Sequence, residues 1–318
     1  MRSDRSAVNE PAPIPSRDTG IPVISGKCEK GRKTLGELLS GAKGFLEVLG
    51  KLEGGASAER LLEHLTGYEK SKLYLQWNAP VTRALAERYR KLVDKRGLGV
   101  PTAYLTGRAF FREETLEVGR DCLIPRPETE LLVEKFIENS GYDEGDRFFF
   151  LDLGTGSGAI GISVLRHFKK SEGVCSDISE PALEIAGRNI ERYGLGDRAE
   201  LVCSDLFERL AIRFPGRRWD AILSNPPYLS AEDLEHLQKE VQYEPRMALS
   251  GGRDGFDFYR RIIPQAREYL VPGGWLAMET GWRQAAQVAR WLEEHGYRGV
   301  RIEKDLAGIE RVVMGKKD

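Results

Sequence analysis

Residues Ser224–Tyr228, with the sequence Ser-Asn-Pro-Pro-Tyr, carry the most specific chemical signal in this chain of 318 residues. They follow Trp219–Leu223, an apolar run bounded by turn signals that predicts a buried strand. The two prolines end that strand because neither has an N–H group to donate. Asn225 precedes a proline and is therefore biased towards an extended conformation. The sequence predicts a stiff loop at the carboxyl end of a strand, the edge where open α/β sheets bind ligands.

This loop has the groups to hold a planar NH₂ group. The side-chain oxygen of Asn225 and the backbone carbonyl of Pro226 are two acceptors at a fixed separation, and a planar NH₂ group has two donors. Amide and base-amine nitrogens are poor nucleophiles, and holding both N–H groups orients the nitrogen lone pair. Tyr228 offers a flat face for packing. We therefore expect Asn225, Pro226 and Tyr228 to be catalytic and Pro227 to complete the substrate-binding loop. The alternative is a turn that merely ends a strand, which Asn-Pro also favours.

A second signal, Asp152–Ala159, ends the first strand of an alternating strand–helix region and predicts a cofactor site. Its glycines permit a tight turn and the close approach of a ligand to backbone N–H groups. Asp177 ends the next predicted strand, where a carboxylate can hold two ribose hydroxyls. The Gly-x-Gly-x-x-Ala spacing also fits a nicotinamide dinucleotide, so the glycines alone do not decide the cofactor. The cofactor-binding residues predicted in this turn are Asp152, Gly154, Thr155, Gly156, Ser157 and Gly158.

The charge of Asp152 favours S-adenosylmethionine as the cofactor. An acid two residues before the first glycine would repel a pyrophosphate but would attract ammonium and sulfonium groups. The other role open to Asp152 is a hydrogen bond to the backbone of the glycine loop, and the two roles are compatible. After the third predicted strand, we expect Asp205 to accept a hydrogen bond from the adenine amine and Leu206 to cover the ring. A helix cap at Asp205 is the alternative there.

The elements that position these residues alternate between strand and helix from Arg147 onwards. This order predicts an α/β fold with a Rossmann-like, doubly wound, mainly parallel seven-stranded sheet. The expected strands are Phe148–Leu153, Gly173–Ser176, Ala199–Cys203, Trp219–Ser224, Trp275–Glu279, Val300–Glu303 and Arg311–Met314. The expected helices between them are Ala159–Phe168, Pro181–Tyr193, Phe256–Tyr269 and Arg283–His295.

The chain before this region divides into three predicted parts. Residues 1–33 are rich in proline and lack periodicity, which predicts a disordered extension. Thr34–Glu37 fits a capping box and opens a small all-α domain over residues 34–98. That domain has amphipathic helices and no catalytic constellation, so its role is either packing or recognition of a partner. Residues 99–124 are predicted to be a linker with a β-hairpin, and residues 125–318 form the α/β domain.

The amino-acid composition limits the compartment in which the protein can work and the partners that it can bind. The chain has 48 Lys and Arg against 49 Asp and Glu, a formal net charge of −1. It therefore lacks the global basic field that drives non-specific binding to nucleic acid. The four cysteines have neither metal-ligand nor redox spacing, and Cys122, Cys175 and Cys203 lie in apolar runs that predict buried free thiols. No apolar stretch reaches the length of a membrane span, and the N-terminus lacks a signal-peptide core. We expect a cytoplasmic monomer with no metal site and no contact with membrane or nucleic acid.

With both motifs placed, the chain resembles the class I S-adenosylmethionine-dependent methyltransferases. More narrowly it resembles the HemK/PrmC family, which methylates the side-chain amide of the glutamine in the Gly-Gly-Gln motif of peptide chain release factors. The resemblance covers roughly residues 34–315. Residues 1–33 have no counterpart, and the hairpin between Thr106 and Val118 matches poorly. Other matching segments are Pro101–Tyr104, Ile124–Glu130, Tyr243–Pro245 with Ala248–Leu249 and Gly251–Gly255, Gly273–Gly274 with Glu279 and Gly281, and Asp305–Gly308 with Arg311.

The resemblance implies a protein-(glutamine-N5) methyltransferase with release factors as its protein substrate. It implies that Asn225 and the Pro226 carbonyl hold the glutamine amide, that Tyr228 packs on it, and that Gly154–Gly158, Asp177 and Asn225 line the cofactor. The helical domain would then bind the release factor. The alternatives are a ribosomal protein glutamine methyltransferase, an adenine amino-methyltransferase acting on nucleic acid, a nicotinamide-dependent oxidoreductase, which Asp152 disfavours, and a non-catalytic binding module.

Overall fold

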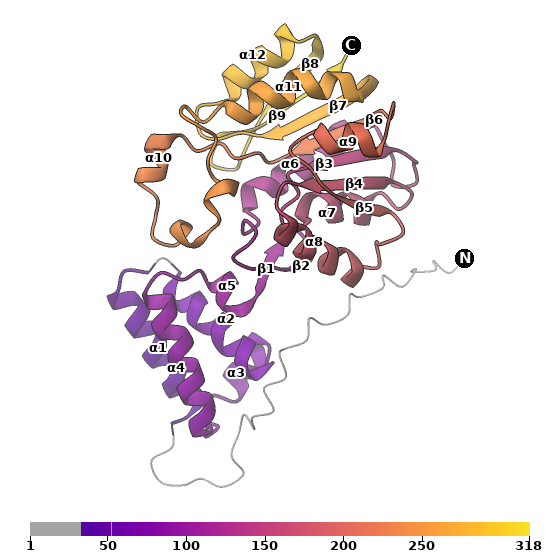
Figure 1. The fold of residues 1–318 in the computed structure, drawn as a ribbon. Coiled ribbons are helices and arrows are strands. Elements are labelled where there is room, and N and C mark those ends of the chain that lie inside the picture. Colours follow the sequence, from indigo (N-terminus) through magenta and orange to yellow (C-terminus); the bar gives the residue numbers. More distant parts are fainter. Residues whose placement is uncertain (1–32, 52) are drawn as a thin grey trace, which may run out of the picture. The chain divides into compact units, whose positions relative to one another are not determined.

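The computed structural model describes residues 33–51 and 53–318. The predicted N-terminal extension falls outside these residues except at Lys33. The described chain forms two compact units, a helical unit and an α/β unit (Figure 1). No helix among the described residues is both long and apolar enough to cross a bilayer.

The helical unit contains the five helices α1 to α5. Its core includes leucines and alanines of the first two helices, Leu73 of the third, and Val81, Leu85, Tyr89 and Val93. The predicted capping box is present, because the Thr34 hydroxyl accepts from the Glu37 N–H and the Glu37 carboxylate accepts from the Thr34 N–H. The bounds are α1 (Leu35–Val48), α2 (Gly54–Thr66), α3 (Lys70–Leu75), α4 (Arg83–Gly97) and α5 (Thr102–Thr106).

The helical unit extends beyond the predicted domain boundary. It includes the chain up to Arg108 and also the short segment Gln238–Tyr243, which the sequence had placed in the α/β domain. Ion pairs of Glu240 explain why this segment belongs to the helical unit. The Glu240 carboxylate accepts hydrogen bonds from Arg96 at 2.9 Å and from Lys51 at 3.2 Å, and Arg96 is almost fully buried. A segment of only six residues is too short to produce a periodic pattern in the sequence.

The α/β unit contains the predicted seven-stranded sheet, in the order β5-β4-β3-β6-β7-β9-β8. The first five strands in this order pair in parallel, while β9 pairs antiparallel with both β7 and β8. The strands are β3 (Phe149–Leu153), β4 (Glu172–Asp177), β5 (Ala199–Cys203), β6 (Trp219–Ser224), β7 (Leu270–Glu279), β8 (Tyr297–Lys304) and β9 (Glu310–Lys317). The predicted fold class is confirmed.

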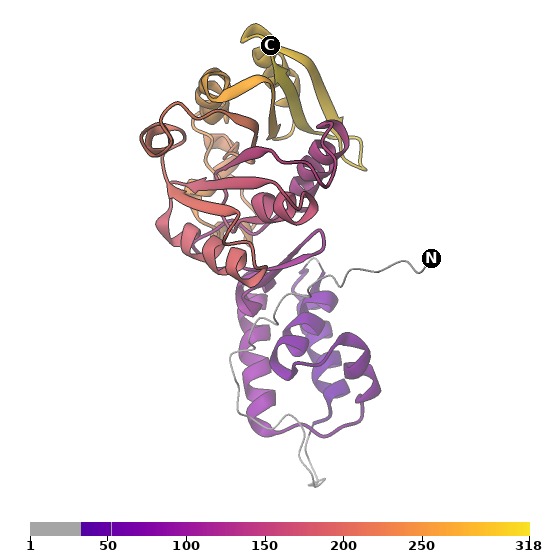
Figure 2. The ribbon, with the colours of Figure 1, turned by 90° about the vertical axis from the view of Figure 1, so that its right-hand side faces the viewer.

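Helices cover both faces of this sheet and build two separate cores (Figure 2). One face packs against α6 (Pro127–Asn139), α7 (Ala159–His167) and α8 (Glu180–Arg192), and the other against α9 (Glu208–Arg213), α11 (Asp257–Tyr269) and α12 (Ala285–Glu294). Successive strand residues alternate between the faces. Phe150 belongs to the first core and Leu151 to the second. Asp152 therefore points towards the first face, where α7 lies.

The predicted hairpin is also present, as β1 (Arg108–Phe111) and β2 (Glu114–Glu117). Asn189 of α8 and Tyr193, the residue that follows this helix, hold the second strand of the hairpin. The Asn189 amide accepts from the Glu117 N–H and donates to the Glu117 carbonyl, and the Tyr193 hydroxyl accepts from the Thr115 N–H. Asn189 also donates to the carbonyl of Ser157 in the glycine loop, at 2.9 Å. The hairpin and the glycine loop thus share one buried amide.

Candidate active site

The carboxyl ends of the parallel strands converge on one cavity of the α/β unit. Leu153, Asp177 and Ser224 are the last residues of β3, β4 and β6, and all three line it. A larger cavity of about 500 Å³ is lined by Phe149, Glu172 and Ala199, the first residues of their strands, so it lies at the opposite edge of the sheet. Ligands of open α/β folds bind at the carboxyl edge. The smaller cavity is therefore the candidate active site.

The glycine turn after β3 adopts the tight geometry that the sequence predicted. Gly154, Gly156 and Gly158 have φ values of 78°, 55° and 85°, a region in which a Cβ atom is strained. The N–H groups of Gly154 and Thr155 both donate to the Ser176 carbonyl of the neighbouring strand. Gly154 and Gly156 line the cavity, whereas Thr155, Ser157 and Gly158 are not among its lining residues. At Gly154 and Gly156 the turn therefore exposes its backbone to the cavity.

Asp177 contributes a carboxylate to the cavity wall. One oxygen accepts from the Gly156 N–H and the other from the Ser179 N–H, both at 2.9 Å. Burial raises the pKa of Asp177, and these two hydrogen bonds oppose the shift. A carboxylate oxygen can accept more than one hydrogen bond, so both retain capacity towards a ligand.

Asp152 lies behind the glycine turn rather than on the cavity wall. It is fully buried, and one carboxylate oxygen accepts from the Thr155 hydroxyl at 2.5 Å and from the Gly161 N–H at 2.9 Å. Burial raises the pKa of Asp152 to about 7. The structure shows the second role considered for Asp152, a hydrogen bond to the backbone that follows the turn, and Asp152 is not among the residues that line the cavity. The reason is strand alternation, which turns this side chain towards α7.

Asp205 and Leu206 both line the cavity, as expected. The Asp205 carboxylate accepts from the Arg261 guanidinium of α11 at 2.8 Å. The alternative role of Asp205 as a helix cap is not observed, because α9 begins after Phe207 without a side-chain cap. Arg261 is a lining residue that the sequence analysis did not single out, since its partner is 56 positions away.

The Asn-Pro-Pro-Tyr loop brings three of its residues to the cavity. Asn225, Pro226 and Pro227 line it, and Tyr228 does not. The Asn225 side-chain amide contacts the Thr129 hydroxyl at 2.9 Å. The structure thus places the proposed clamp and the glycine turn on the walls of one cavity, and Tyr228 beside it.

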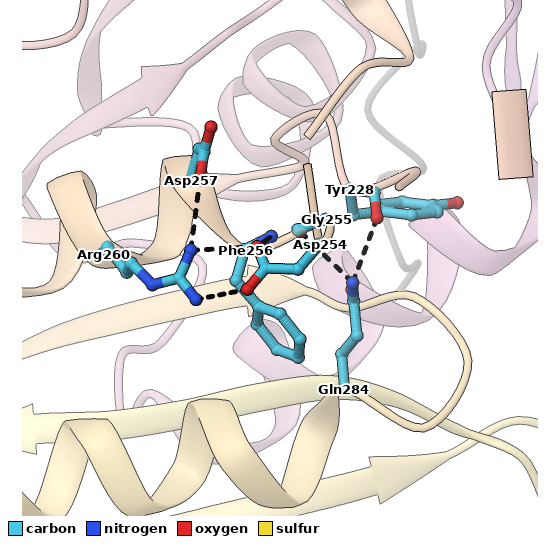
Figure 3. Close-up of polar contacts among 7 residues, drawn as sticks. All are labelled: Tyr228, Asp254, Gly255, Phe256, Asp257, Arg260 and Gln284. Carbon is cyan, nitrogen blue, oxygen red and sulfur yellow. Dashed lines mark hydrogen bonds and ion pairs between the residues drawn. The ribbon is translucent and has the colours of Figure 1, made fainter. Parts of the chain in front are cut away.

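Tyr228 is fixed by its backbone. Gln284 donates from its side-chain amide to the carbonyls of Tyr228, at 3.0 Å, and Gly255, at 3.2 Å (Figure 3). Gly281 packs so closely that an added Cβ would lie 2.8 Å from the Tyr228 ring. Burial raises the pKa of the Tyr228 hydroxyl. These contacts make Gln284 and Gly281 supports of the loop; Gly281 stands in one of the matching segments, whereas nothing in the sequence singled out Gln284.

Figure 3 also shows Arg260 of α11, which pairs with Asp254 and with Asp257. The pair with Asp254 ties the loop before α11 to that helix, and the Gly255 carbonyl of this loop shares Gln284 with Tyr228. Among the described residues, no group of three or more His, Cys, Asp or Glu side chains is arranged to hold a metal ion.

Two further polar residues lie behind the clamp. Thr129, in the first turn of α6, contacts the carboxylate of Glu279, the last residue of β7, at 2.5 Å. Both side chains are buried. In the sequence they stand out only as members of the matching segments. A polar residue ending a buried strand, as at Asp177, was the signal that could have singled out Glu279.

Comparisons with known proteins agree with this architecture. The PrmC N-terminal domain family matches residues 37–107, and the methyltransferase small domain family matches residues 127–253. The release factor glutamine methyltransferase of Geobacter sulfurreducens is 37% identical over 89% of this chain and 96% of its own length. That of Bordetella pertussis is 39% identical over 81% and 93%. The hMettl16 catalytic domain, solved with the MAT2A 3'UTR hairpin 1, shares the fold at 15% identity and a TM-score of 0.51, covering 76% of this chain and 84% of that one.

The sheet order, the glycine turn and the Asn-Pro-Pro-Tyr loop define a class I methyltransferase. The sequence identity of this chain to release factor glutamine methyltransferases, over nearly their full length, shows which family of that class it is. The chain belongs to the release factor glutamine methyltransferase family, as the resemblance predicted.

Proposed function

We propose that this protein transfers a methyl group from S-adenosylmethionine to the side-chain amide nitrogen of the glutamine in the Gly-Gly-Gln motif of peptide chain release factors. Membership of the family supports the reaction. One observation carries the assignment to this site: Asn225 and Pro226 share a single cavity with Gly154, Gly156 and Asp177. A methyl donor and its amide acceptor must meet within such a cavity.

The charge of the cavity suits this cofactor. Its lining includes three carboxylates, of Asp121, Asp177 and Asp205, and one guanidinium, of Arg261. A wall with this balance attracts ammonium and sulfonium groups and repels a pyrophosphate. We assign the ribose to Asp177, the adenine to Asp205 and Leu206, and the approach of the cofactor backbone to Gly154 and Gly156. When bound, S-adenosylmethionine supplies the methyl group on a positively charged sulfur.

The chain's own residues position the acceptor. The Asn225 side-chain oxygen and the Pro226 carbonyl accept the two N–H groups of the glutamine amide, so that the nitrogen lone pair points along the line of transfer. Holding both donors in place before the reaction removes the need to reorganise them during it. The N–C bond would form as the sulfur–methyl bond breaks, which leaves a neutral thioether, and one amide N–H proton would then pass to water. Pro227 completes the wall, and Tyr228 provides the face on which the amide packs.

We further propose that the helical unit recognises the release factor and that the protein acts as a cytoplasmic monomer. Cys122 and Cys175 are both buried, and the free thiol of Cys175 supports a reducing compartment. Cys203, which the sequence also predicted as buried, is half-exposed and free.

The test is methyl transfer from labelled S-adenosylmethionine to separate acceptors: a release factor, the same factor with Gly-Gly-Ala in place of Gly-Gly-Gln, a ribosomal protein and duplex DNA. We expect one methyl group on the motif glutamine, located by mass spectrometry, and none on the Gly-Gly-Ala protein. Label on the ribosomal protein or on DNA, with an unmodified release factor, would assign the site to one of the rival acceptors.

A further inference from the structure

We propose that Thr129 and Glu279 are positioning residues that fix which way the Asn225 amide faces. The inference rests on the proposed function of Asn225 and deepens it. Thr129 stands between the other two side chains, 2.9 Å from the amide nitrogen of Asn225 and 2.5 Å from a carboxylate oxygen of Glu279.

The number of hydrogens that Thr129 can donate fixes the orientation of the Asn225 amide. A threonine hydroxyl has one hydrogen to donate and two lone pairs, whereas an ionised carboxylate can only accept. The distance of 2.5 Å to Glu279 is typical of a charge-assisted O–H···O⁻ bond. The Thr129 hydrogen is therefore committed to Glu279, and its oxygen must accept from Asn225. The amide nitrogen then faces Thr129, and the amide oxygen faces the other way, free to accept from a substrate N–H.

The burial of Thr129 and Glu279 excludes the opposite orientation of the Asn225 amide. Thr129 is 4% exposed and Glu279 1%, so water does not replace either partner. A flipped amide would set its oxygen against a hydroxyl oxygen that has no hydrogen left to give. An unpaired buried acceptor is unfavourable because it has lost its hydration without compensation.

The start of α6 is itself held in place. Glu244 accepts from the Ile124 N–H at 3.1 Å and from the Arg126 guanidinium at 2.5 Å. These bonds fix the segment that leads into Pro127, the first residue of α6, and so fix Thr129 two residues later. The amide of Asn225 thus rests on a rigid support.

The charged groups around Glu279 come from several elements. Glu128 of α6 disfavours its charge, whereas Arg311 of β9 and a hydrogen bond from the Tyr228 hydroxyl favour it. The Tyr259 hydroxyl of α11 donates to its backbone carbonyl at 3.0 Å. Burial outweighs the favourable contacts and raises the pKa of Glu279 to about 7. When Glu279 is protonated, it donates a hydrogen bond to Thr129. The hydroxyl hydrogen of Thr129 must then donate elsewhere, and it competes with the substrate N–H for the amide oxygen of Asn225. The clamp is correctly set only while Glu279 is ionised.

The experiment compares Thr129→Val, which keeps the shape and removes the hydroxyl, with Thr129→Ser, which restores the hydroxyl. Thr280→Val is the matched control, because Thr280 is also buried and its hydroxyl has no hydrogen-bond partner among the described residues. We expect Thr129→Val to lower kcat on the release factor by about tenfold to a hundredfold, on the scale of a misdirected transition-state contact. Thr129→Ser and Thr280→Val should stay close to wild type. Binding of S-adenosylhomocysteine, measured by calorimetry, should be the same in all of them.

Glu279→Gln adds a readout that a purely structural role would not move. In the wild type, kcat should fall on the acid side of about pH 7, where Glu279 gains its proton. In Glu279→Gln this acid limb should flatten, because no charge remains to titrate there.

Wild-type kcat in Thr129→Val at all pH values would overturn the inference, and so would a parallel loss of S-adenosylhomocysteine binding, which would assign Thr129 to structure alone. If Asn225→Ala is impaired while Thr129→Val is not, the proposed function stands and this inference fails. If Asn225→Ala is also unimpaired, the clamp itself fails.

Discussion

The carboxylate of Asp177 accepts a hydrogen bond from the backbone N–H of Gly156 at 2.9 Å. This bond joins the end of β4 to the glycine turn after β3, so one side chain both shapes the turn and lines the cavity. The residue to which we assign the ribose is therefore also the residue that holds the loop.

Asp177→Ala should weaken cofactor binding. It removes the acceptor for the ribose hydroxyls and for the Gly156 N–H, and hydrogen bonds to a charged group contribute about 1.5–3 kcal/mol each. We expect at least a tenfold rise in the Kd of S-adenosylhomocysteine, measured by calorimetry. Asp197→Ala, at an exposed carboxylate, is the control and should bind as the wild type does. Unchanged affinity in Asp177→Ala would remove this residue from the cofactor site.

Asn225→Ala should lower turnover by at least about a hundredfold, the scale of losing one preorganised transition-state contact. The amide oxygen is lost, and one substrate N–H is left without an acceptor. Stability should change little, because Asn225 is half-exposed at the cavity wall. Single-turnover rates with a release factor, with thermal unfolding as the check on folding, measure the effect. Near-wild-type turnover in a folded variant would contradict the clamp.

Asp152 should make stability depend on pH. Its pKa is raised by burial from 3.8 to about 7, so between these values the folded state holds a proton that the unfolded state has released. The contribution of Asp152 to stability is therefore complete below about pH 4, decreases as pH rises and levels off above about pH 7. Each pKa unit corresponds to about 1.4 kcal/mol.

Denaturant unfolding of the wild type and of Asp152→Asn, across pH 4 to 8, tests this. Asparagine keeps an acceptor for Thr155 and Gly161 and does not titrate. The stability of the wild type minus that of Asp152→Asn should decrease as pH rises towards 7. A difference that is constant with pH, or that increases, would show that Asp152 is ionised throughout.

Glu240→Gln should destabilise the helical unit. Burial favours the neutral form of Glu240, but hydrogen bonds from Arg96 and Lys51 outweigh it and hold the pKa of Glu240 below its usual value. This contribution is present at neutral pH and is lost as pH falls through the folded-state pKa. We expect a loss of about 1–3 kcal/mol in the free energy of unfolding at pH 7. Glu235→Gln, at an exposed site, is the control. Equal stability of the two variants would contradict the prediction.

The sequence sufficed for features that are local in the chain. Apolar runs ending in Asp177 and Asn225 placed both residues at strand ends, and parallel pairing then brought them to one edge. It did not suffice where contacts join distant segments. Thr129 and Glu279 are 150 positions apart, and no pattern in either segment encodes their hydrogen bond. Asp152 was predicted to face the ligand because spacing locates a residue along a strand without telling which core its side chain enters.

The passage of Gln238–Tyr243 through the helical unit has a consequence for evolution and for protein engineering. The chain enters that unit twice, so no single cut separates the two units. A chimaera that exchanged only the segment before Arg108 would pair a foreign helical unit with this protein's Glu240, whose partners Lys51 and Arg96 would have been replaced. Exchange of the whole helical unit between relatives therefore requires two crossovers, or a single one followed by compensating changes in the six residues Gln238–Tyr243.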